Sequence, residues 1–172
     1  MDAGSWQAEV FAALKAAQIA QIGYVPDAGH AQLIEAAHAD PAMRAVVLTT
    51  EEEGVALAAG AWLGGERAVL LMQSSGVGNC INMLSLPANC RMPFLSLVTM
   101  RGEWGEFNPW QVPMGAATAA VLAAAGVHVR RVERADEAAE TVAAAAALAF
   151  DSAVSVAVLL SQRLIGAKVF VQ

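Results

Sequence analysis

The chain has 172 residues, of which 57% are hydrophobic and 15% are charged, and its formal net charge is −6. This composition excludes an intrinsically disordered protein, which needs low hydrophobicity and high charge. With 10 lysine and arginine residues against 16 acidic ones, the chain also lacks the basic character of a nucleic-acid-binding protein. The length fits a single domain over 1–172.

The apolar content does not predict a membrane protein. The longest stretches without charge, 68–90 and 107–129, contain glycine, proline and amide residues, whereas a spanning helix needs about 20 consecutive mainly apolar residues. The N-terminal segment lacks the basic flank and apolar run of a signal peptide. We therefore expect a cytoplasmic protein in which Cys80 and Cys90 are buried thiols.

Short aliphatic runs alternate with alanine-rich segments along the chain. In chain order, the pattern predicts a helix over Ser5–Ala20, a strand over Ile22–Val25, a helix over Ala28–His38, a strand over Ala45–Leu48, a helix over Glu51–Leu63, a strand over Ala68–Met72, a helix over Val77–Leu86, a strand over Phe94–Thr99, a helix over Trp110–Ala125, a strand over Val127–Val132, a helix over Asp136–Phe150 and a strand over Val154–Leu160. The strands are continuous apolar runs, which are typical of strands buried on both faces. The alternation predicts an α/β fold of three layers, α/β/α, around a mostly parallel six-stranded sheet.

In open α/β sheets the ligand lies at the carboxyl ends of the strands. That rule selects the loops that hold most of the unusual polar residues: 26–30, 49–53, 73–79 and 101–111.

The loop 49–53 contains three consecutive glutamates. Thr50 and Glu53 match a capping box, which accounts for Glu53 and leaves Glu52 as a solvated residue. Glu51 is then the first helical residue, directly at the end of a strand. Local pattern alone leaves two interpretations open: a catalytic carboxylate or an acid that complements the helix dipole.

The segment 73–79 reads as a glycine loop between a strand and a helix, which fits either a ligand-binding loop or a tight turn. A dinucleotide-binding fingerprint is excluded because Ile81 stands where the third glycine is required. The sequence has no GKS or GKT for a P-loop, and neither Ser74 nor Ser75 lies in a G-x-S-x-G nucleophile motif.

The loop 101–111 combines charges, two tryptophans and glycines after a strand. It fits a functional loop, a surface lid or a subunit contact, because Trp and Arg favour interfaces. His30, close to Asp27 in the first loop, is a candidate for polar lining. No cluster of His, Cys, Asp or Glu has metal-ligand spacing, so no metal site is predicted in this chain.

Taken together and in order, these loops resemble a known family. The segments that carry the resemblance are 24–27 (YVPD), 49–54 (TTEEEG), 58–61 (AAGA), 72–79 (MQSSGVGN) and 101–103 (RGE) through 111–115 (QVPMG). They are similar to the pyrimidine-binding half of thiamine-diphosphate decarboxylases, specifically the alpha subunit of sulfopyruvate decarboxylase and the related phosphonopyruvate decarboxylase. The resemblance extends over nearly the whole chain.

The resemblance implies a role for Glu51. The family places its glutamate nine residues before the glycine of an A-x-G turn, and Gly60 minus nine is Glu51. A carboxyl group bonded to the aminopyrimidine N1′ favours the imino tautomer, whose nitrogen removes the thiazolium C2 proton. The cofactor carries the chemistry, and the protein supplies orientation and a desolvated cleft. The implied cofactor-binding residues are Glu51, Pro26, Gln73, Ser75 and Gly76, and the implied substrate-binding residues are Asp27, His30, Asn79, Arg101 and Gln111.

The sequence departs from the family pattern in two ways. It has no Gly-Asp-Gly, the motif with which the family holds Mg²⁺ and diphosphate. The resemblance therefore implies a separate diphosphate-binding beta subunit that holds Mg²⁺, a hetero-oligomer with a dimeric core, and a chain that is catalytically incomplete alone. Ser74 stands where the family has Asn, which leaves the 2-oxo acid open: 3-sulfopyruvate, phosphonopyruvate or another.

Two further alternatives remain at this stage. Arg101 offers a fork of donors for a sulfonate or phosphonate, but it equally fits a lid or interface arginine. Half of an active site also fits a non-catalytic interaction or regulatory subunit, which would have no chemical reason to keep Glu51. For a catalytic and for a non-catalytic subunit alike, the high apolar content predicts a surface that contacts other chains, because obligate interfaces resemble a core cut in half.

Overall fold

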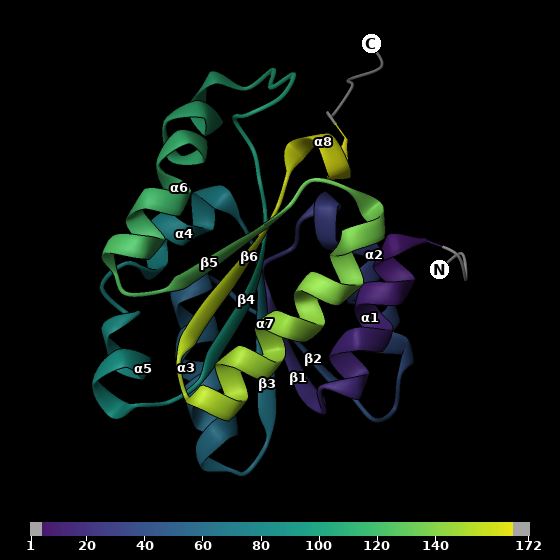
Figure 1. Ribbon diagram of the computed structural model, residues 1–172, viewed down its shortest axis with the longest axis vertical. Coiled ribbons are helices and arrows are strands. Elements are labelled where there is room, and N and C mark those ends of the chain that lie inside the picture. Colours follow the sequence, from purple (N-terminus) through teal and green to yellow (C-terminus); the bar gives the residue numbers. More distant parts are fainter. Residues whose placement is uncertain (1–4, 167–172) are drawn as a thin grey trace.

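The computed structural model describes residues 5–166 (Figure 1). The strands are β1 (Ile19–Tyr24), β2 (Arg44–Val47), β3 (Arg67–Gln73), β4 (Phe94–Thr99), β5 (His128–Val132) and β6 (Ser155–Leu160). The α-helices are α1 (Trp6–Ala16), α2 (Ala31–Ala39), α3 (Glu51–Leu63), α4 (Ser74–Cys80), α5 (Ser85–Cys90), α6 (Val112–Ala124), α7 (Ala138–Ser152) and α8 (Gln162–Ile165). Short 3₁₀ turns occupy η1 (Ala28–His30), η2 (Pro109–Gln111) and η3 (Ala135–Glu137).

The strands form one six-stranded sheet in the order β2-β1-β3-β4-β6-β5, and each pairing is parallel. Helices α1, α2 and α7 cover one face, whereas α3, α4, α5 and α6 lie on the other (Figure 1). The predicted three-layer α/β/α architecture is confirmed. From β1 the chain moves to β2 on one side, and from β3 it moves to β4 on the other, so the topological switch point lies between β1 and β3.

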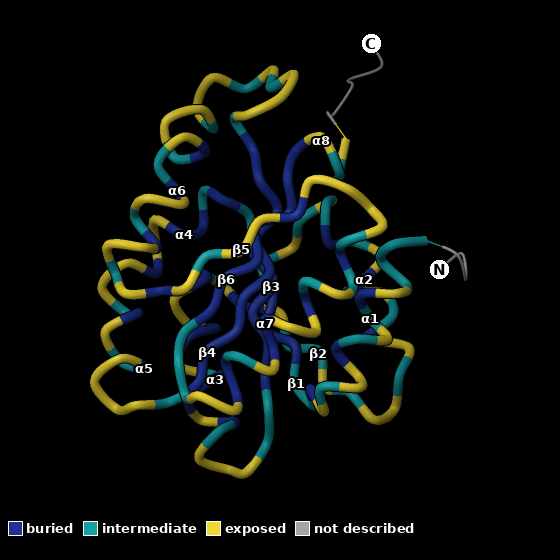
Figure 2. The backbone as a smooth tube through the Cα atoms, in the orientation of Figure 1, coloured by how far each residue is buried: buried dark blue, intermediate teal, exposed yellow. Residues whose placement is uncertain are grey.

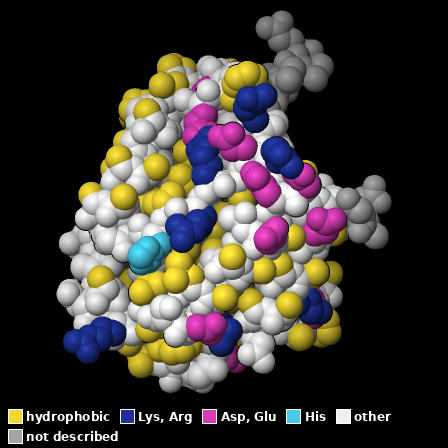
Figure 3. Space-filling view, viewed as in Figure 1, with side chains coloured by type: hydrophobic (Ala, Val, Ile, Leu, Met, Phe, Trp, Pro, Cys, Tyr) yellow, Lys and Arg dark blue, Asp and Glu magenta, His cyan; other side chains and the backbone are white. Residues whose placement is uncertain are grey.

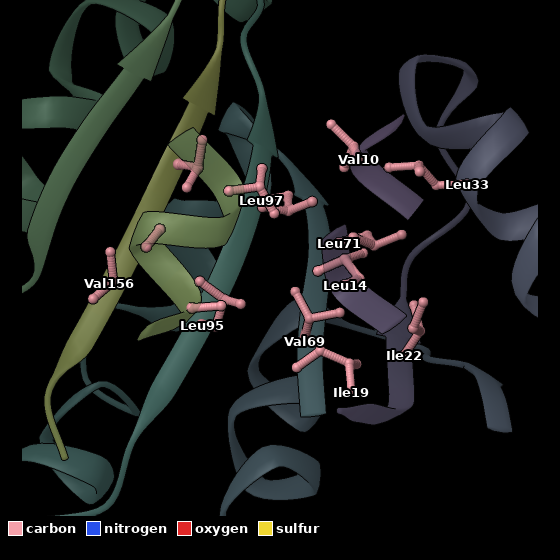
Figure 4. Packing of buried hydrophobic residues seen from close by; sticks show 14 of the residues in the cluster. Val10, Leu14, Ile19, Ile22, Leu33, Val69, Leu71, Leu95, Leu97 and Val156 are labelled. Carbon is pink, nitrogen blue, oxygen red and sulfur yellow. The ribbon is translucent and has the colours of Figure 1, made fainter. Parts of the chain in front are cut away.

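Each sheet face carries its own hydrophobic core. Figure 4 shows the first, where Val10 and Leu14 of α1 approach Leu71 of β3 and α7 lies beside Leu95 and Leu97 of β4. The second cluster packs α3, α4 and α6 on the opposite face. The strands β3, β4 and β6 are almost wholly buried, as Figure 2 shows in dark blue. The prediction of burial on both faces is confirmed for these central strands and is wrong for the edge strands: β2 has no buried residue, and in β5 only Val132 is buried.

The largest departures from the predicted boundaries concern two helices. The first helix ends at Ala16 rather than Ala20, because Gln18 adopts a left-handed conformation (φ 61°) that ends the helix and starts β1 at Ile19. The predicted helix over Val77–Leu86 is two helices, α4 and α5. Because α4 begins at Ser74, directly after β3, the segment 73–79 is a helical turn and not a glycine loop.

Two other expectations concern the surface. Cys80 is buried as predicted, but Cys90 is exposed at the end of α5, so the prediction of two buried thiols is half wrong. Among residues 5–166, no helix is both long and apolar enough to cross a bilayer.

Candidate active site

Glu51 is the first residue of α3, immediately after the turn that follows β2. Its side chain is almost buried, with 8% of the residue exposed. Asn79 of α4 donates a hydrogen bond from Nδ2 to Glu51 Oε2 over 2.8 Å. Between residues 5 and 166, the structure records no hydrogen bond to the other carboxyl oxygen, Oε1. Glu51 is therefore a nearly buried carboxyl group with one oxygen held and one oxygen free.

Gly76 explains why this carboxyl group fits against α4. A Cβ atom at position 76 would lie 2.3 Å from Glu51 Cδ and 2.3 Å from Oε1. Such a distance is far inside van der Waals contact, so a side chain here would displace the carboxyl group. The glycine that the sequence pattern placed in a loop or tight turn instead lies inside a helix, where it makes room for Glu51.

The capping box predicted for α3 is not formed, because neither of its two side-chain hydrogen bonds is present. Thr50 occupies the N-cap position but its side chain makes no capping hydrogen bond. Glu53 does fold back, but its Oε2 accepts from the backbone N–H of Thr49 (2.8 Å) rather than from Thr50. Glu52 and Glu53 are exposed, so of the three glutamates Glu51 alone is directed into the protein.

A second acidic side chain, Asp27, lies at the switch point, after β1. Its Oδ1 accepts from Gln73 Nε2 (2.9 Å), and its Oδ2 accepts from Thr99 Oγ1 (2.7 Å) and from the backbone N–H of Gly29 (3.1 Å). Gln73 in turn accepts a hydrogen bond from Ser75 Oγ at its Oε1 (2.9 Å). The ends of β1, β3 and β4 are thereby joined into one polar chain.

Ser75 connects this polar chain to an apolar hollow of about 620 Å³ lined by Ser75, Pro109, Trp110, Pro113 and Met114. Ser75 directly precedes Gly76, the residue of α4 that packs against the Glu51 carboxyl group. Gln111, the last residue of η2, is half-buried and its Oε1 is buried without a hydrogen-bond partner. Pro26 is exposed at the end of β1, beside Asp27.

His30 does not line the site. It is fully buried, and its Nε2 lies 3.2 Å from the carbonyl oxygen of Met72 and 3.1 Å from that of Leu97. Because both carbonyls only accept, Nε2 carries the proton and donates, while Nδ1 is buried without a partner. Burial lowers the pKa of His30, and the nearby Asp27 charge opposes this with a smaller effect. His30 therefore supports the ends of β3 and β4, and a ligand cannot reach it without rearrangement.

Arg101 is likewise committed within the chain. It is 6% exposed, and its guanidinium donates to both oxygens of Glu106 (2.7 and 2.5 Å). The ion pair and three other donors hold the pKa of Glu106 at about 2, and Glu106 raises the pKa of Arg101. The Arg101 guanidinium, which the sequence offered as a donor to a sulfonate or phosphonate, is occupied by the Glu106 carboxylate. The structure therefore favours a structural arginine over a ligand-binding one.

Two buried polar residues were missed by sequence reasoning. Thr99 is the last residue of a continuous apolar strand, and only its position at a carboxyl end marks it. Gln162 begins α8 and holds the loop after β4: its Oε1 accepts from the backbone N–H groups of Glu103 and Trp104 (2.9 Å each), and its Nε2 donates to Glu106 (2.9 Å). No local pattern in the sequence signals this contact, because 56 residues separate Gln162 from Glu106.

Comparison with known proteins decides the family. No family model matches the chain. It is 38% identical over 152 residues to the sulfopyruvate decarboxylase subunit alpha of Methanothermobacter thermautotrophicus, a match that covers 88% of this chain and 92% of that protein. The chain belongs to the family of sulfopyruvate decarboxylase alpha subunits. The equivalent subunit of Methanococcus maripaludis is 34% identical, with 79% of this chain and 82% of that protein covered.

Two further matches cover only part of a longer protein. The phosphonopyruvate decarboxylase of Streptomyces viridochromogenes is 38% identical over 67% of this chain but only 30% of that longer protein. Among solved structures, 2-oxoglutarate:ferredoxin oxidoreductase from Magnetococcus marinus superposes with a TM-score of 0.73 at 14% identity, covering 94% of this chain and 29% of that one. This second similarity shows the fold alone.

Proposed function

We propose that this chain is the pyrimidine-binding subunit of a thiamine-diphosphate-dependent decarboxylase that converts 3-sulfopyruvate to sulfoacetaldehyde and CO₂. The family membership supports the reaction class, because the relatives that match over most of their length are named for this decarboxylation. The observation that carries the proposal is the Glu51 carboxyl group, nearly buried against Gly76 with one oxygen left free.

The residues present fit an aminopyrimidine group. When bound, thiamine diphosphate supplies the nucleophilic carbon and the electron sink for loss of CO₂. Glu51 holds a proton at the pyrimidine N1′ through the carboxyl oxygen that Asn79 does not occupy. Near burial of Glu51 strengthens this hydrogen bond by excluding water. Gly76 leaves the room that the carboxyl group needs.

The other predicted site residues divide between lining and support. Ser75 and Gln111 lie at the carboxyl end of the sheet beside the Trp110 hollow, where we place the pyrimidine and the 2-oxo acid. Gln73 accepts a hydrogen bond from Ser75 and donates one to Asp27, so these two residues hold Ser75 in place. Pro26 lies next to Asp27. We exclude His30 and Arg101 from the ligand-binding set because their donors are used within the chain.

We further propose that a diphosphate-binding beta subunit completes the site and holds Mg²⁺. The exposed surface around the site supports this: Trp110 is 83% exposed and Val112 is 44% exposed. The whole of α6, which begins at Val112, contains no charged residue. In Figure 3 the rim at α6 shows hydrophobic side chains, whereas charged side chains gather toward α8 and α7.

We propose that 1–172 forms one pyrimidine-binding domain of a hetero-oligomer with a dimeric core in the cytoplasm, where its free thiols stay reduced.

The deciding experiment is reconstitution. The chain is co-expressed with the product of the neighbouring gene, and CO₂ release is measured with thiamine diphosphate, Mg²⁺ and, in separate assays, sulfopyruvate, phosphonopyruvate and pyruvate. We expect turnover of sulfopyruvate by the pair and none by either chain alone. Preference for phosphonopyruvate would assign the reaction of the Streptomyces relative instead. A stable pair that binds no cofactor and decarboxylates none of the three acids would overturn the enzyme in favour of an interaction subunit.

A further inference from the structure

The hydrogen-bond chain at the switch point has a fixed direction. Asp27 receives three donors: Gln73 Nε2 on one oxygen, and Thr99 Oγ1 and the Gly29 N–H on the other. A carboxylate only accepts, so the amide group of Gln73 must turn its NH₂ toward Asp27. The fit around this group is close, since a Cβ at Gly29 would lie 2.7 Å from Thr99 Cγ2 and 2.9 Å from Asp27 Oδ2.

The orientation of Gln73 determines that of Ser75. With its NH₂ facing Asp27, Gln73 presents its carbonyl oxygen to Ser75 Oγ, 2.9 Å away. A carbonyl oxygen only accepts, so Ser75 must donate its single hydroxyl proton inward. The remaining capacity of Ser75 Oγ is its lone pairs, and Ser75 lines the apolar hollow formed with Trp110 and Met114.

We propose that Asp27 is a positioning residue which, through Gln73, makes Ser75 Oγ a hydrogen-bond acceptor toward this hollow. The site then takes a ligand that pairs an apolar, planar face with an N–H donor at this point. Under the proposed function, on which this part rests, the 4′-amino group of the aminopyrimidine is that donor.

The isosteric substitution Asp27→Asn reverses the donor and acceptor roles along this series of hydrogen bonds. In Asp27→Asn, the Gly29 N–H still requires an acceptor, so the new amide keeps its oxygen there and turns its NH₂ toward Gln73. Gln73 must then flip and donate to Ser75, whose hydroxyl proton is released toward the hollow. A single exchange of oxygen for nitrogen thus turns the outward acceptor into an outward donor without a change of shape.

The first test follows the Gln73 side-chain amide by NMR in the ¹⁵N-labelled chain, without ligand, using Gln73→Leu to assign its resonances. In the wild type, we expect Ser75→Ala to leave the amide shifts and proton exchange nearly unchanged, because Ser75 contacts only the carbonyl oxygen. In the Asp27→Asn background, Ser75→Ala should change both strongly, and Ser85→Ala, at an exposed serine, should change neither.

In the wild type, a change of the amide shifts and proton exchange by Ser75→Ala that far exceeds the change by Ser85→Ala would overturn the proposed direction. This arm decides even if Asp27→Asn fails to fold.

The second test measures binding in the reconstituted complex by quenching of tryptophan fluorescence, with thiamine diphosphate and its 4′-oxo analogue as probes. We expect the wild type to prefer the amino compound and Asp27→Asn to shift the ratio of affinities by about tenfold toward the oxo compound, the worth of one hydrogen bond. Ser75→Ala should abolish the dependence on residue 27. An unchanged ratio in Asp27→Asn would overturn the ligand contact.

The two tests separate the inference from the proposed function. Failure of the wild-type complex to bind either compound would overturn the proposed function and the ligand assigned to Ser75. The amide resonances would still decide whether Asp27 orients Ser75, because they need no cofactor.

Discussion

Two acidic side chains, Asp27 and Glu51, follow the first two strands of the sheet and differ in how completely they are hydrogen-bonded. Asp27 receives three donors on its two oxygens. Glu51 is nearly buried yet receives one recorded donor, Asn79, and its neighbour Gly76 has no side chain to fill the space at its other oxygen. The fold supplies hydrogen-bond donors to both oxygens of Asp27, whereas one oxygen of Glu51 is left for a ligand to bind.

This difference distinguishes a supporting acid from a reacting one. A buried polar group without its full set of partners costs stability, and native structures keep few of them without a reason. Residues kept for reactivity are therefore expected to lose function and retain or gain stability when neutralised. Residues that complete the fold should show the opposite pattern, and four predictions test this contrast.

The largest effect is expected for Glu51→Gln. The amide cannot hold the proton at the pyrimidine that the carboxyl group holds, so turnover of the reconstituted enzyme should fall by at least about 100-fold. The melting temperature of the chain should stay the same or rise, because a nearly buried charge is removed. Glu52→Gln, at the exposed neighbour, is the matched control and should change neither quantity. Normal turnover in Glu51→Gln would reject the role of this residue.

The next effect concerns Asp27→Ala and falls on stability. The substitution removes the acceptor of Gln73 and of the Gly29 N–H and leaves Thr99 Oγ1 only the Met72 carbonyl oxygen, 3.4 Å away, so we expect the free energy of unfolding to drop by about 3 kcal/mol. Urea unfolding of the isolated chain measures this. Asp27→Asn, which keeps the shape and one acceptor, should lose clearly less. If both variants are as stable as the wild type, Asp27 does not complete the fold, and the contrast with Glu51 disappears.

The same contrast explains what could be predicted from the sequence. The order of strands and helices and the parallel sheet follow from apolar runs that alternate with alanine-rich segments, which are local signals. For Glu51, the capping pattern set its two neighbours aside but left two interpretations open, and the resemblance to the decarboxylase family assigned its role; the structure shows that Thr50 does not cap as expected. The polar chain from Asp27 to Ser75 was not predicted, since it joins residues 46 and 72 positions apart.

The errors at the site have the same physical origin. Gly76 was assigned to a ligand-binding loop or a tight turn because glycines after a strand suggest a loop, but its constraint is the Glu51 carboxyl group, 25 residues earlier in the chain. The sequence left Arg101 open between a ligand-binding and a lid or interface arginine, because nothing local shows that it forms a buried ion pair with Glu106. Pairings of this kind are decided by tertiary packing.

Gly76→Ala tests whether the space beside Glu51 is needed. The added methyl group would overlap the carboxyl group at 2.3 Å, so we expect a loss of stability of about 2 kcal/mol together with reduced turnover. Gly78→Ala is the matched control in the same helix, because its Cβ would meet nothing closer than Met114 Sδ at 3.5 Å. That control should be neutral or slightly stabilising, as replacement of glycine by alanine usually is in a helix. Equal behaviour of the two variants would show that Gly76 makes no special room.

The smallest effect is a pH dependence of the stability of the chain that comes from His30, close to Asp27. Burial lowers the pKa of His30 in the folded chain below its ordinary value of about 6.5, so the unfolded chain binds the proton more readily. Stability from neutral His30 is therefore fully present above pH 6.5 and is lost as the pH falls toward the folded-state pKa, by up to about 1.4 kcal/mol per pH unit. We expect His30→Gln, which keeps an N–H donor for the Met72 and Leu97 carbonyls, to flatten this profile between pH 7.5 and about 5.5, above the range where carboxylates titrate. His128→Gln, at an exposed histidine, should leave the profile as it is. A wild-type profile without this slope would mean that His30 accepts a proton in place, and the support of β3 and β4 beside Asp27 would then be looser than its burial indicates.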